Sequence, residues 1–430
     1  MKIKVKKLSY NEVMNLPPLP HRKVTRQSPF FRVLMNTLSK GEVKKTHFTH
    51  TEIGMDRLGK KEAALYLMNH SSFIDLSIAS TLIYPKPYHI VCTSDGFVGK
   101  EFLMRRLGCI PTRKFQTDVN LVRDMQRALK KLQSSVLMYP EASYTFDGTA
   151  TPLPAGLGKC IKLLEVPVIM IKTNGAFLRD PLYNCLQLRD VEISATEEYI
   201  LSPEEIKSMT PSEINAVLKK QFTFDNFKYQ QDNRIRVSEP FRADGLNRIL
   251  YKCPHCRKEG NMVGKGTSIS CTNCGQKYTL DEYGKLVLTS KGEGEGSDLS
   301  FEHIPDWYRW EREEVKKEIE KGTYKLEVPV TIRMMVNFDA IYEVGEGILT
   351  HTVDGFTLNG CDGLLSYSQS SKSSYSIYSD YYWYELGDTI CIGDSKALYY
   401  CFPPTNTDVV AKTRLATEEI YKYLKSTCEK

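Results

Sequence analysis

Apolar runs of strand length alternate with longer amphipathic stretches between residues 46 and 248. Between the second and third of these runs, residues 118–133 repeat their apolar positions at helical spacing. Strands that alternate with helices predict an α/β domain, with flanking helices packed on a mixed, largely parallel sheet. The runs expected to form buried strands are 64–68, 88–93, 135–139, 166–171 and 191–193.

The last part of the chain shows a different pattern. Over 323–430, short strand-like runs are separated by turn signals such as Asp354-Gly355 and Asn359-Gly360, and one helix is expected at 409–424. This predicts a β-rich domain of pleckstrin-homology-like (PH-like) type, closed by that helix. The Ser- and Tyr-rich stretch 366–386 predicts a long aromatic hairpin, which either faces a lipid or peptide or packs across its own strands.

These patterns divide the chain into five parts. A basic amphipathic arm occupies 1–45, the α/β domain 46–248, a cysteine-rich module 249–290, a linker and helix 291–322, and the β-rich domain 323–430. The linker opens with the Gly-rich, charged stretch KGEGEGSD at 291–298. The sequence shows no internal repeat and no Gly-rich fingerprint for a dinucleotide or phosphate.

The composition of the chain mainly indicates its cellular location. Hydrophobic residues make up 41% and charged residues 26% of the chain, as in ordinary globular proteins. No run approaches the roughly 18 apolar residues of a membrane span, and the first residues are basic and polar, unlike a signal peptide. Of the 12 cysteines, all but four are scattered without a disulfide-like framework. We therefore expect a cytoplasmic protein, peripheral on the inner face of the membrane.

Positive charge is concentrated in the arm. Residues 1–45 hold eleven Lys or Arg and two Glu, whereas the rest of the chain is net negative, since the total is only +6. The segment SPFFRVLMNTLSK at 28–40 predicts a basic amphipathic helix, which favours an anionic membrane surface as its partner. The alternative is that its apolar face packs on the neighbouring domain. That face would comprise Phe30, Phe31, Val33, Leu34, Met35 and Leu38.

The stretch YLMNHSSFIDLSIAS at 66–80 places His70 five residues before Asp75. On one continuous helix, this spacing turns two side chains apart by about 140°. The two residues can meet only if His70 precedes a helix and Asp75 lies in its first turn, as the apolar run 73–83 with Ser72 as N-cap predicts. Alternatively, Asp75 only satisfies free N–H groups at the start of that helix.

Three further segments follow along the α/β domain. They read GCIPTRK at 108–114, YPEAS at 139–143 and VPVI at 166–169. YPEAS ends a predicted strand and VPVI begins another, while GCIPTRK is a turn that carries Arg113 and Lys114. Because the carboxyl ends of strands line the ligand crevice of an α/β sheet, these segments can converge near His70.

The segment NHSSFID resembles the Asn-His-x-Ser-x-x-Asp block of the glycerolipid acyltransferases, the 1-acylglycerol-3-phosphate (PlsC-type) family. GCIPTR, YPEAS and VPVI are similar to the second, third and fourth blocks of this family, in the same order and with matching gaps. The resemblance covers about residues 46–245. Four blocks in order are a much more specific signal than one.

The resemblance implies a role for each matching residue. His70 would be the general base that takes the proton of an acceptor hydroxyl as it attacks a thioester, and Asp75 would fix its tautomer and stabilise the imidazolium. The N–H groups after Ser72 would face the developing oxyanion. The second block implies a phosphate site and the third an acceptor pocket, while Asn69 and Ser72 would mainly support the turn. The implied substrate-binding residues are Asn69, Ser72, Arg113, Lys114, Glu141 and Ser143.

Two departures from the family pattern concern the acceptor. The third block usually continues Gly-Thr-Arg, whereas this chain has Ala142, Ser143 and Tyr144, so the phosphate-facing arginine is missing. The lysines that commonly precede a later glycine are also absent, and Lys159 is the nearby candidate to replace them.

The expected reaction is transfer of a fatty acyl group from acyl-CoA or an acyl-carrier protein to the hydroxyl of a lysophospholipid. The default acceptor is 1-acylglycerol-3-phosphate, and a different lipid alcohol is the first alternative. The second alternative is a non-catalytic lipid-binding scaffold, whose cysteine-rich module and β-rich domain recruit a partner.

The cysteine-rich module contains two Cys-x-x-Cys knuckles, Cys253/Cys256 and Cys271/Cys274, with fourteen residues between them. Four thiolates at this spacing predict a closed, structural Zn²⁺ site of zinc-ribbon type, with iron as the minor alternative. His255 lies inside the first knuckle and is not expected to be a ligand, because four sulfurs already fill the coordination sphere. Nucleic acid is not the expected partner, since aromatic residues are few among the basic ones.

Overall fold

The centre of the computed structural model, which describes residues 3–116, 118–405 and 407–428, is a seven-stranded mixed sheet. Its strand order is β2–β8–β7–β3–β6–β4–β5, and the last five strands of this order run parallel to one another. Their carboxyl ends therefore meet at one edge. The strands are β2 (Thr49–Ile53), β3 (Leu65–Met68), β4 (Tyr88–Thr93), β5 (Cys109–Thr112), β6 (Ser135–Met138), β7 (Val168–Asn174) and β8 (Ser194–Leu201).

One expected strand was placed wrongly. Val191 and Ile193 are buried, but they precede strand β8 and do not form it. β8 alternates buried and partly exposed residues and pairs antiparallel with β7. Such a strand offers only every second side chain to the core, so its sequence, SATEEYIL, lacks the continuous apolar run of a fully buried strand.

Helices cover both faces of the seven-stranded sheet. On one face, α2 (Pro29–Lys44) and α3 (Asp75–Ile83) pack over Tyr66 and Met68 of β3. On the other, α5 (Val119–Gln126), α6 (Leu157–Leu164) and α9 (Pro211–Gln221) pack over Leu65 and Leu67. Successive residues of β3 thus point to opposite faces, and all four are buried. The remaining helices of this domain are α4 (Glu101–Arg106), α7 (Ala176–Arg179), α8 (Pro203–Ser208) and α10 (Asn226–Asp232).

The cysteine-rich module forms an antiparallel four-stranded sheet in the order β12–β11–β10–β9. It is followed by helix α11 (Ile304–Glu320), which packs against the C-terminal helix α12 (Val409–Cys428). The strands are β9 (Met262–Lys265), β10 (Ser268–Cys271), β11 (Lys277–Leu280) and β12 (Leu286–Ser290).

The last part of the chain is a mainly antiparallel sheet in the order β16–β15–β14–β13–β19–β18–β17, followed by α12. A strand from the N-terminus, β1 (Val5–Lys7), extends this sheet by pairing in parallel with β14, and the short helix α1 (Tyr10–Met14) follows. Residues 5–7 therefore lie in the C-terminal sheet, although the sequence grouped 1–45 as one arm. The other strands are β13 (Leu326–Met335), β14 (Ile341–Thr352), β15 (Gly355–Gly360), β16 (Leu365–Ser370), β17 (Tyr378–Asp380), β18 (Thr389–Gly393) and β19 (Leu398–Phe402).

The expected hairpin at 366–386 is wrong. β16 and β17 lie at opposite ends of the strand order, where β16 pairs with β15 and β17 pairs with β18. A β-rich domain with one C-terminal helix is present, and its PH-like character stays a prediction.

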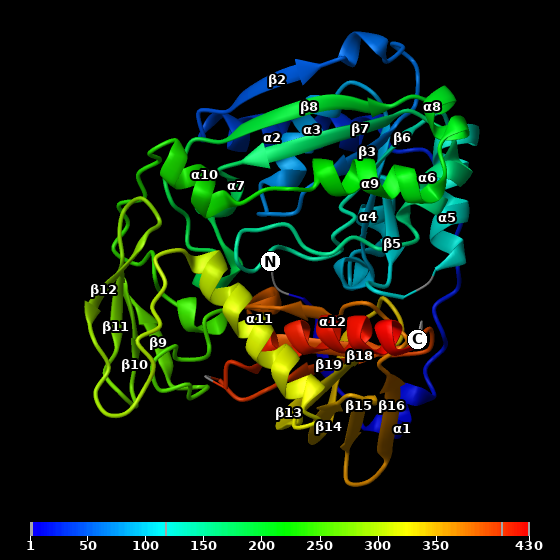
Figure 1. Ribbon diagram of the computed structural model, residues 1–430. Coiled ribbons are helices and arrows are strands. Elements are labelled where there is room, and N and C mark those ends of the chain that lie inside the picture. Colours follow the sequence, from blue (N-terminus) through cyan, green and yellow to red (C-terminus); the bar gives the residue numbers. More distant parts are fainter. Residues whose placement is uncertain (1–2, 117, 406, 429–430) are drawn as a thin grey trace.

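The C-terminal sheet covers the carboxyl-end edge of the seven-stranded sheet. Figure 1 shows the seven-stranded sheet and its helices above, the C-terminal sheet below, and the four-stranded sheet to one side. Tyr378 and Trp383 of the C-terminal domain both donate hydrogen bonds to the buried carboxylate of Asp95, which directly follows β4 (2.8 and 3.0 Å). This contact places the C-terminal domain over the loops that carry the predicted site.

Candidate active site

His70 and Asp75 meet at the junction between β3 and α3. Nδ1 of His70 lies 3.2 Å from Oδ2 of Asp75, and the same oxygen accepts hydrogen bonds from the backbone N–H groups of Ser71 (2.7 Å) and Ser72 (3.0 Å). The Asp75 side chain is wholly buried, and that of His70 is 15% exposed. The expected arrangement is therefore present: His70 precedes the helix and Asp75 lies in its first turn.

The expected cap at Ser72 is wrong. Helix α3 begins at Asp75, and its N-cap is Ile74. The hydroxyl of Ser72 instead donates to Asp180 and accepts from the backbone of Ile74. The N–H groups of Ser71 and Ser72 donate to Asp75 and hold this carboxylate in place. The expected role of the N–H groups after Ser72 toward an oxyanion stays a prediction.

The hydrogen bonds fix the tautomer of His70. Above about pH 7, where Asp75 is ionised, its carboxylate can only accept, so Nδ1 carries the proton and Nε2 is left as a proton acceptor. Burial, assisted by the charge of Lys114, holds the pKa of His70 well below its ordinary value. Burial also raises the pKa of Asp75 to about 7, against the opposing effect of the Ser72 and Ser71 donors. His70 is therefore a neutral base over the physiological pH range.

Two tyrosines enclose the imidazole of His70. Tyr139 and Tyr144 stack on it with centroid distances of 4.1 and 3.8 Å. Phe73 stacks in turn on Tyr144 at 5.3 Å. Tyr144 stands where the family pattern has arginine, so an aromatic ring covers the base where a cation was expected.

Glu141 links the turn at His70 to Thr151 by hydrogen bonds. One carboxylate oxygen accepts from the backbone N–H of His70 (3.1 Å), and the other accepts from the backbone and hydroxyl of Thr151 (2.7 and 2.9 Å). Burial raises the pKa of Glu141 to about 7, although the hydrogen bonds from Thr151 and His70 oppose this. Since both oxygens bond to the chain itself, the geometry favours a structural role for Glu141.

Asn69 fixes the end of β3 to β7. Its amide accepts from the backbone of Thr173 (2.8 Å) and donates to Ser71 (3.1 Å) and to the carbonyl of Thr173 (3.2 Å). These bonds match the supporting role expected for Asn69.

The second block points toward the C-terminal domain. Arg113 donates to the carbonyl of Asp394 (3.1 Å), and the ammonium group of Lys114 lies 4.0 Å from the centroid of the Tyr378 ring. No hydrogen bond or ion pair joins either residue to His70 within the ranges that the structure describes. Lys114 nevertheless acts on His70 through its charge.

Arg414 is the residue that the sequence could not reveal. It lies on α12, is 4% exposed, and donates to the hydroxyl of Ser143 (2.8 Å) and the carbonyl of Tyr144 (3.2 Å). A guanidinium from the C-terminal helix thus contacts the third block, which lacks its own arginine, while Lys159 is exposed on α6. The only available signal was the missing arginine itself, because nothing local links two segments about 270 residues apart.

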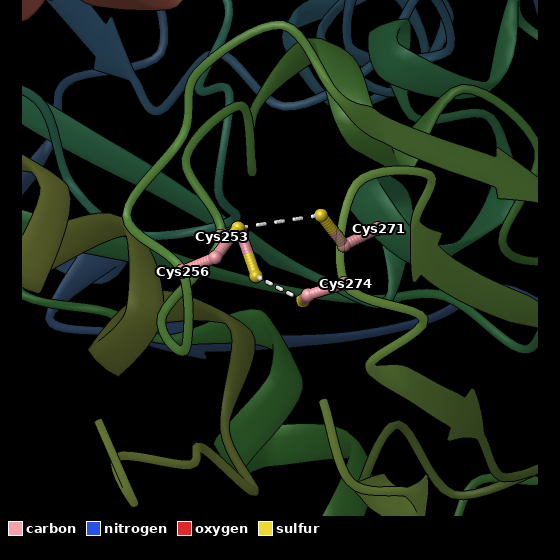
Figure 2. Close-up of side chains that lie close together, drawn as sticks. All are labelled: Cys253, Cys256, Cys271 and Cys274. Carbon is pink, nitrogen blue, oxygen red and sulfur yellow. Dashed lines mark hydrogen bonds between the residues drawn. The ribbon is translucent and has the colours of Figure 1, made fainter. Parts of the chain in front are cut away.

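The four cysteines of the module come together as expected (Figure 2). The sulfurs of Cys253 and Cys274 lie 3.7 Å apart, as do those of Cys256 and Cys271, and all four lie within 4.8 Å of one another. Zn–S bonds of about 2.3 Å in a tetrahedron require sulfur separations of about 3.8 Å, so the set fits a zinc ion. His255 instead contacts the carbonyl oxygen of Ser297 through Nδ1 (2.9 Å).

Comparison with known proteins identifies the segment that carries the His70 site. Residues 50–172 match the family model described as Acyltransferase, which confirms the family resemblance over this segment. No curated protein matches the chain. A similar solved structure is the 1-acyl-sn-glycerophosphate (LPA) acyltransferase PlsC from Thermotoga maritima, at 14% identity and a TM-score of 0.34, covering 44% of this chain and 78% of that one. Residues 50–172 are therefore an acyltransferase-family domain, and the four-cysteine module and C-terminal sheet lie outside it.

The buried carboxyl of Asp75 predicts a pH-dependent stability difference. Its pKa is about 7 in the folded chain against an ordinary value of 3.8. The folded state therefore keeps a proton that the unfolded state loses, and this contribution to stability is lost as the pH rises through about 7. Asp75→Asn removes the cost of ionising the buried carboxyl. We therefore expect the unfolding free energy of the variant, relative to that of wild type, to increase between about pH 4 and pH 8 by up to ~4 kcal/mol, and its relative melting temperature to increase with it. Thermal unfolding of both proteins across this range measures the difference, and a difference that does not change with pH would contradict the prediction.

Proposed function

We propose that this chain transfers a fatty acyl group from an acyl-CoA or acyl-carrier-protein thioester to the hydroxyl of a lysophospholipid. The observation that carries the proposal is the His70–Asp75 pair within the acyltransferase-family segment. No other described residue hydrogen-bonds to Nε2 of His70, so this nitrogen is available to an incoming hydroxyl.

The reaction needs one base and no protein nucleophile. The acceptor oxygen attacks the thioester carbonyl carbon while Nε2 of His70 takes the hydroxyl proton, and the imidazolium is stabilised by Asp75. When the carbon–sulfur bond breaks, the leaving thiolate takes the proton from Nε2. The products are the new ester and a free thiol, and His70 returns to its starting state.

The proposed acceptor contacts lie at the second block. Arg113 and Lys114 supply the positive charge for a phosphate through charge-assisted bonds, and 1-acylglycerol-3-phosphate is the simplest acceptor of this kind. Glu141, Ser143, Asn69 and Ser72 would shape the site through the bonds that fix the His70 turn. Arg414 would take over part of the task of the missing third-block arginine by holding Ser143 and the Tyr144 backbone in place.

One observation favours the alternative of a non-catalytic lipid-binding scaffold. Tyr144 stacks directly on His70, and the C-terminal domain lies over the same edge of the sheet. In that case the fold would bind lipid without transferring an acyl group. Turnover measurements separate the two proposals.

For the four-cysteine cluster, we propose a structural zinc ion. Four sulfurs that leave no open position give the metal no catalytic role, and the ion would hold the two knuckles of the module together. The carbonyl of Lys252, next to Cys253, accepts a hydrogen bond from the buried indole of Trp307 on α11 (3.1 Å). The metal would therefore also fix α11, which packs on α12.

The membrane-facing surface would be built on α2. No helix among the described residues is both long and apolar enough to cross a membrane. α2 buries Asn36, Ser39 and Val43 against the domain, while Phe30 and Leu38 remain 68% and 65% exposed. With Lys40 and Lys44 exposed on the same helix, this apolar face suits the surface of an anionic bilayer. Its other exposed members are Val33 and Leu34, and Phe73 and Leu76 of the adjoining α3 region are also exposed.

The first experiment measures thiol release from a long-chain acyl-CoA with lysophosphatidate as acceptor. We expect release that requires the acceptor and that falls by about 10²–10⁴ in His70→Ala, the usual contribution of a general base. His50→Ala, which removes an exposed histidine of β2, is the matched control and should keep the wild-type rate. Equal rates for wild type and His70→Ala would exclude His70 as the base, and a lipid-binding protein without turnover on any lysolipid would support the scaffold.

Metal content tests the cysteine site. We expect about one zinc ion per chain by elemental analysis, loss of that ion in Cys271→Ser, and a lower melting temperature after chelation, because metal binding and folding are coupled. Cys185→Ser, which changes a free cysteine outside the cluster, should keep both the metal and the melting temperature. Iron in place of zinc would correct the identity of the ion, and absence of any metal would contradict the site.

Vesicle binding tests the α2 surface. The triple variant Phe30→Ser, Leu34→Ser and Leu38→Ser should bind vesicles of phosphatidylglycerol and phosphatidylcholine at least about tenfold more weakly than wild type, since each apolar side chain contributes roughly 1.5–3 kcal/mol when buried. The control triple variant changes Leu188, Val287 and Leu364, which are also exposed, to Ser. Equal loss in both variants would show that α2 is not the membrane-facing element.

A further inference from the structure

A cavity of about 380 Å³ lies where the second block meets the C-terminal sheet. Lys114, Phe115 and Gln116 line it from the loop after β5, and β16, β17 and β18 line it from the other side. β16 and β17 are opposite edges of the C-terminal sheet, so the sheet curls and presents both edges to one cavity. The side chain of Gln369 on β16 accepts from the backbone of Gly393 on β18 (2.9 Å), which fixes this curl.

Six serines line this cavity. Ser373, Ser374 and Ser376 donate their hydroxyls to groups of the chain itself, whereas the hydroxyls of the exposed Ser368 and Ser395 bond to no described residue. Hydroxyls both donate and accept, so these two can bind a ligand that itself carries hydroxyls. The serines that line the cavity are Ser368, Ser370, Ser373, Ser374, Ser376 and Ser395.

Lys114 supplies positive charge at one end of the cavity. Its ammonium group lies over the ring of Tyr378, and no carboxylate of the described residues comes within 4.0 Å of it. Burial lowers the pKa of Lys114, while Asp380 and Asp95 oppose this effect from a greater distance. A partly buried ammonium without a direct ion pair favours an anionic ligand, and a phosphate is the anion that the acyl-acceptor site requires.

Lys114 lines the cavity, and its charge also lowers the pKa of His70, which is not itself part of the lining. Both residues follow parallel strands that end at the same edge of the sheet. In a lysophospholipid, the phosphate and the free hydroxyl sit on neighbouring carbons of glycerol, so a phosphate at Lys114 would direct the hydroxyl toward His70.

We propose that this cavity binds the head group of the acceptor, and that the acceptor is a lysophospholipid whose phosphate carries a polyhydroxylated substituent. The proposal rests on the proposed acyl transfer and names its substrate class. The volume of the cavity falls in the range of roughly 300–1,000 Å³ that small-molecule sites occupy, which is far more than a bare phosphate fills. Lys114 pairs with the phosphate, and Ser368 and Ser395 hydrogen-bond the substituent. Asp394 also lines the cavity, and its Oδ1 accepts from the backbone N–H groups of Lys396 and Ala397. Choline that is esterified to the phosphate carries no hydroxyl for the two serines to bond.

The test compares acceptors in the full-length protein. Acyl transfer from a long-chain acyl-CoA is measured with lysophosphatidylinositol, lysophosphatidylglycerol, lysophosphatidate and lysophosphatidylcholine. Binding of the water-soluble glycerophosphoinositol and glycerol 3-phosphate is measured by calorimetry, which does not depend on turnover. We expect kcat/KM for the polyol-bearing acceptors to exceed that for lysophosphatidate and lysophosphatidylcholine by about tenfold, because only a substituent that carries hydroxyls can hydrogen-bond Ser368 and Ser395.

Three variants assign the effect to the cavity. Ser395→Trp, which fills it, should lower the ratio of polyol-bearing acceptor to lysophosphatidate by about tenfold, and Lys114→Gln should weaken binding of both soluble phosphates. Ser366→Trp is the matched control: Ser366 is exposed on the same strand as Ser368, but it does not line the cavity.

The outcomes separate this inference from the proposed function. If the enzyme prefers lysophosphatidate, and Ser395→Trp does not change the kcat/KM ratio of polyol-bearing acceptor to lysophosphatidate, the head-group site is overturned. The proposed acyltransferase activity would still be supported. Transfer that prefers lysophosphatidylcholine would also overturn the head-group site. Binding of glycerophosphoinositol that Lys114→Gln and Ser395→Trp weaken, without transfer to any acceptor, would support the head-group site and overturn the proposed activity.

Discussion

The buried carboxylate of Asp95 holds the two large domains of this protein together. It accepts hydrogen bonds from the hydroxyl of Tyr378 and the indole of Trp383, and it lies at the carboxyl end of β4, beside the other strand ends that carry the candidate site. Removing a charged group from water costs several kcal/mol unless it is well bonded, so this contact holds only when the domains are docked in one position. The docked position in turn places Arg414 against the third block and Tyr378 under Lys114. The candidate site in the acyltransferase-family segment is therefore completed partly by residues of the C-terminal domain, which lies outside that segment.

The sequence predicted those parts of the site that depend on near neighbours in the chain. The apolar run at 64–68 requires a buried strand, and the following polar residues require a turn, so the meeting of His70 and Asp75 follows from local geometry. The Cys-x-x-Cys spacings are likewise local and brought four sulfurs together. Ser72 was wrongly predicted to cap the helix because its hydroxyl bonds to Asp180, which lies more than 100 residues away in the sequence.

The parts that the sequence did not predict depend on distant partners. β8 buries only every second side chain, Glu197 among them, and is placed by its pairing with β7. β16 and β17 look like a hairpin until their true partners, β15 and β18, are known. The periodicity of α2 showed an amphipathic helix but not which side would face the domain, and the structure buries Asn36 and Ser39 and leaves Phe30 exposed. The sequence also could not predict the role of Arg414, because its partner Ser143 lies in another domain.

The pairing of β1 with β14 has a consequence for how the chain is made. Val5 pairs with Ile341, so β1 must wait for its partner while more than 300 further residues are synthesised. At about 5–20 residues per second, that delay is roughly 20–70 s. The acyltransferase-family segment can fold in this interval, whereas the sheet that covers the candidate site cannot be completed until its later strands are made. Completion of the site would then be timed by translation, with the acyltransferase-family segment formed before the sheet that covers it.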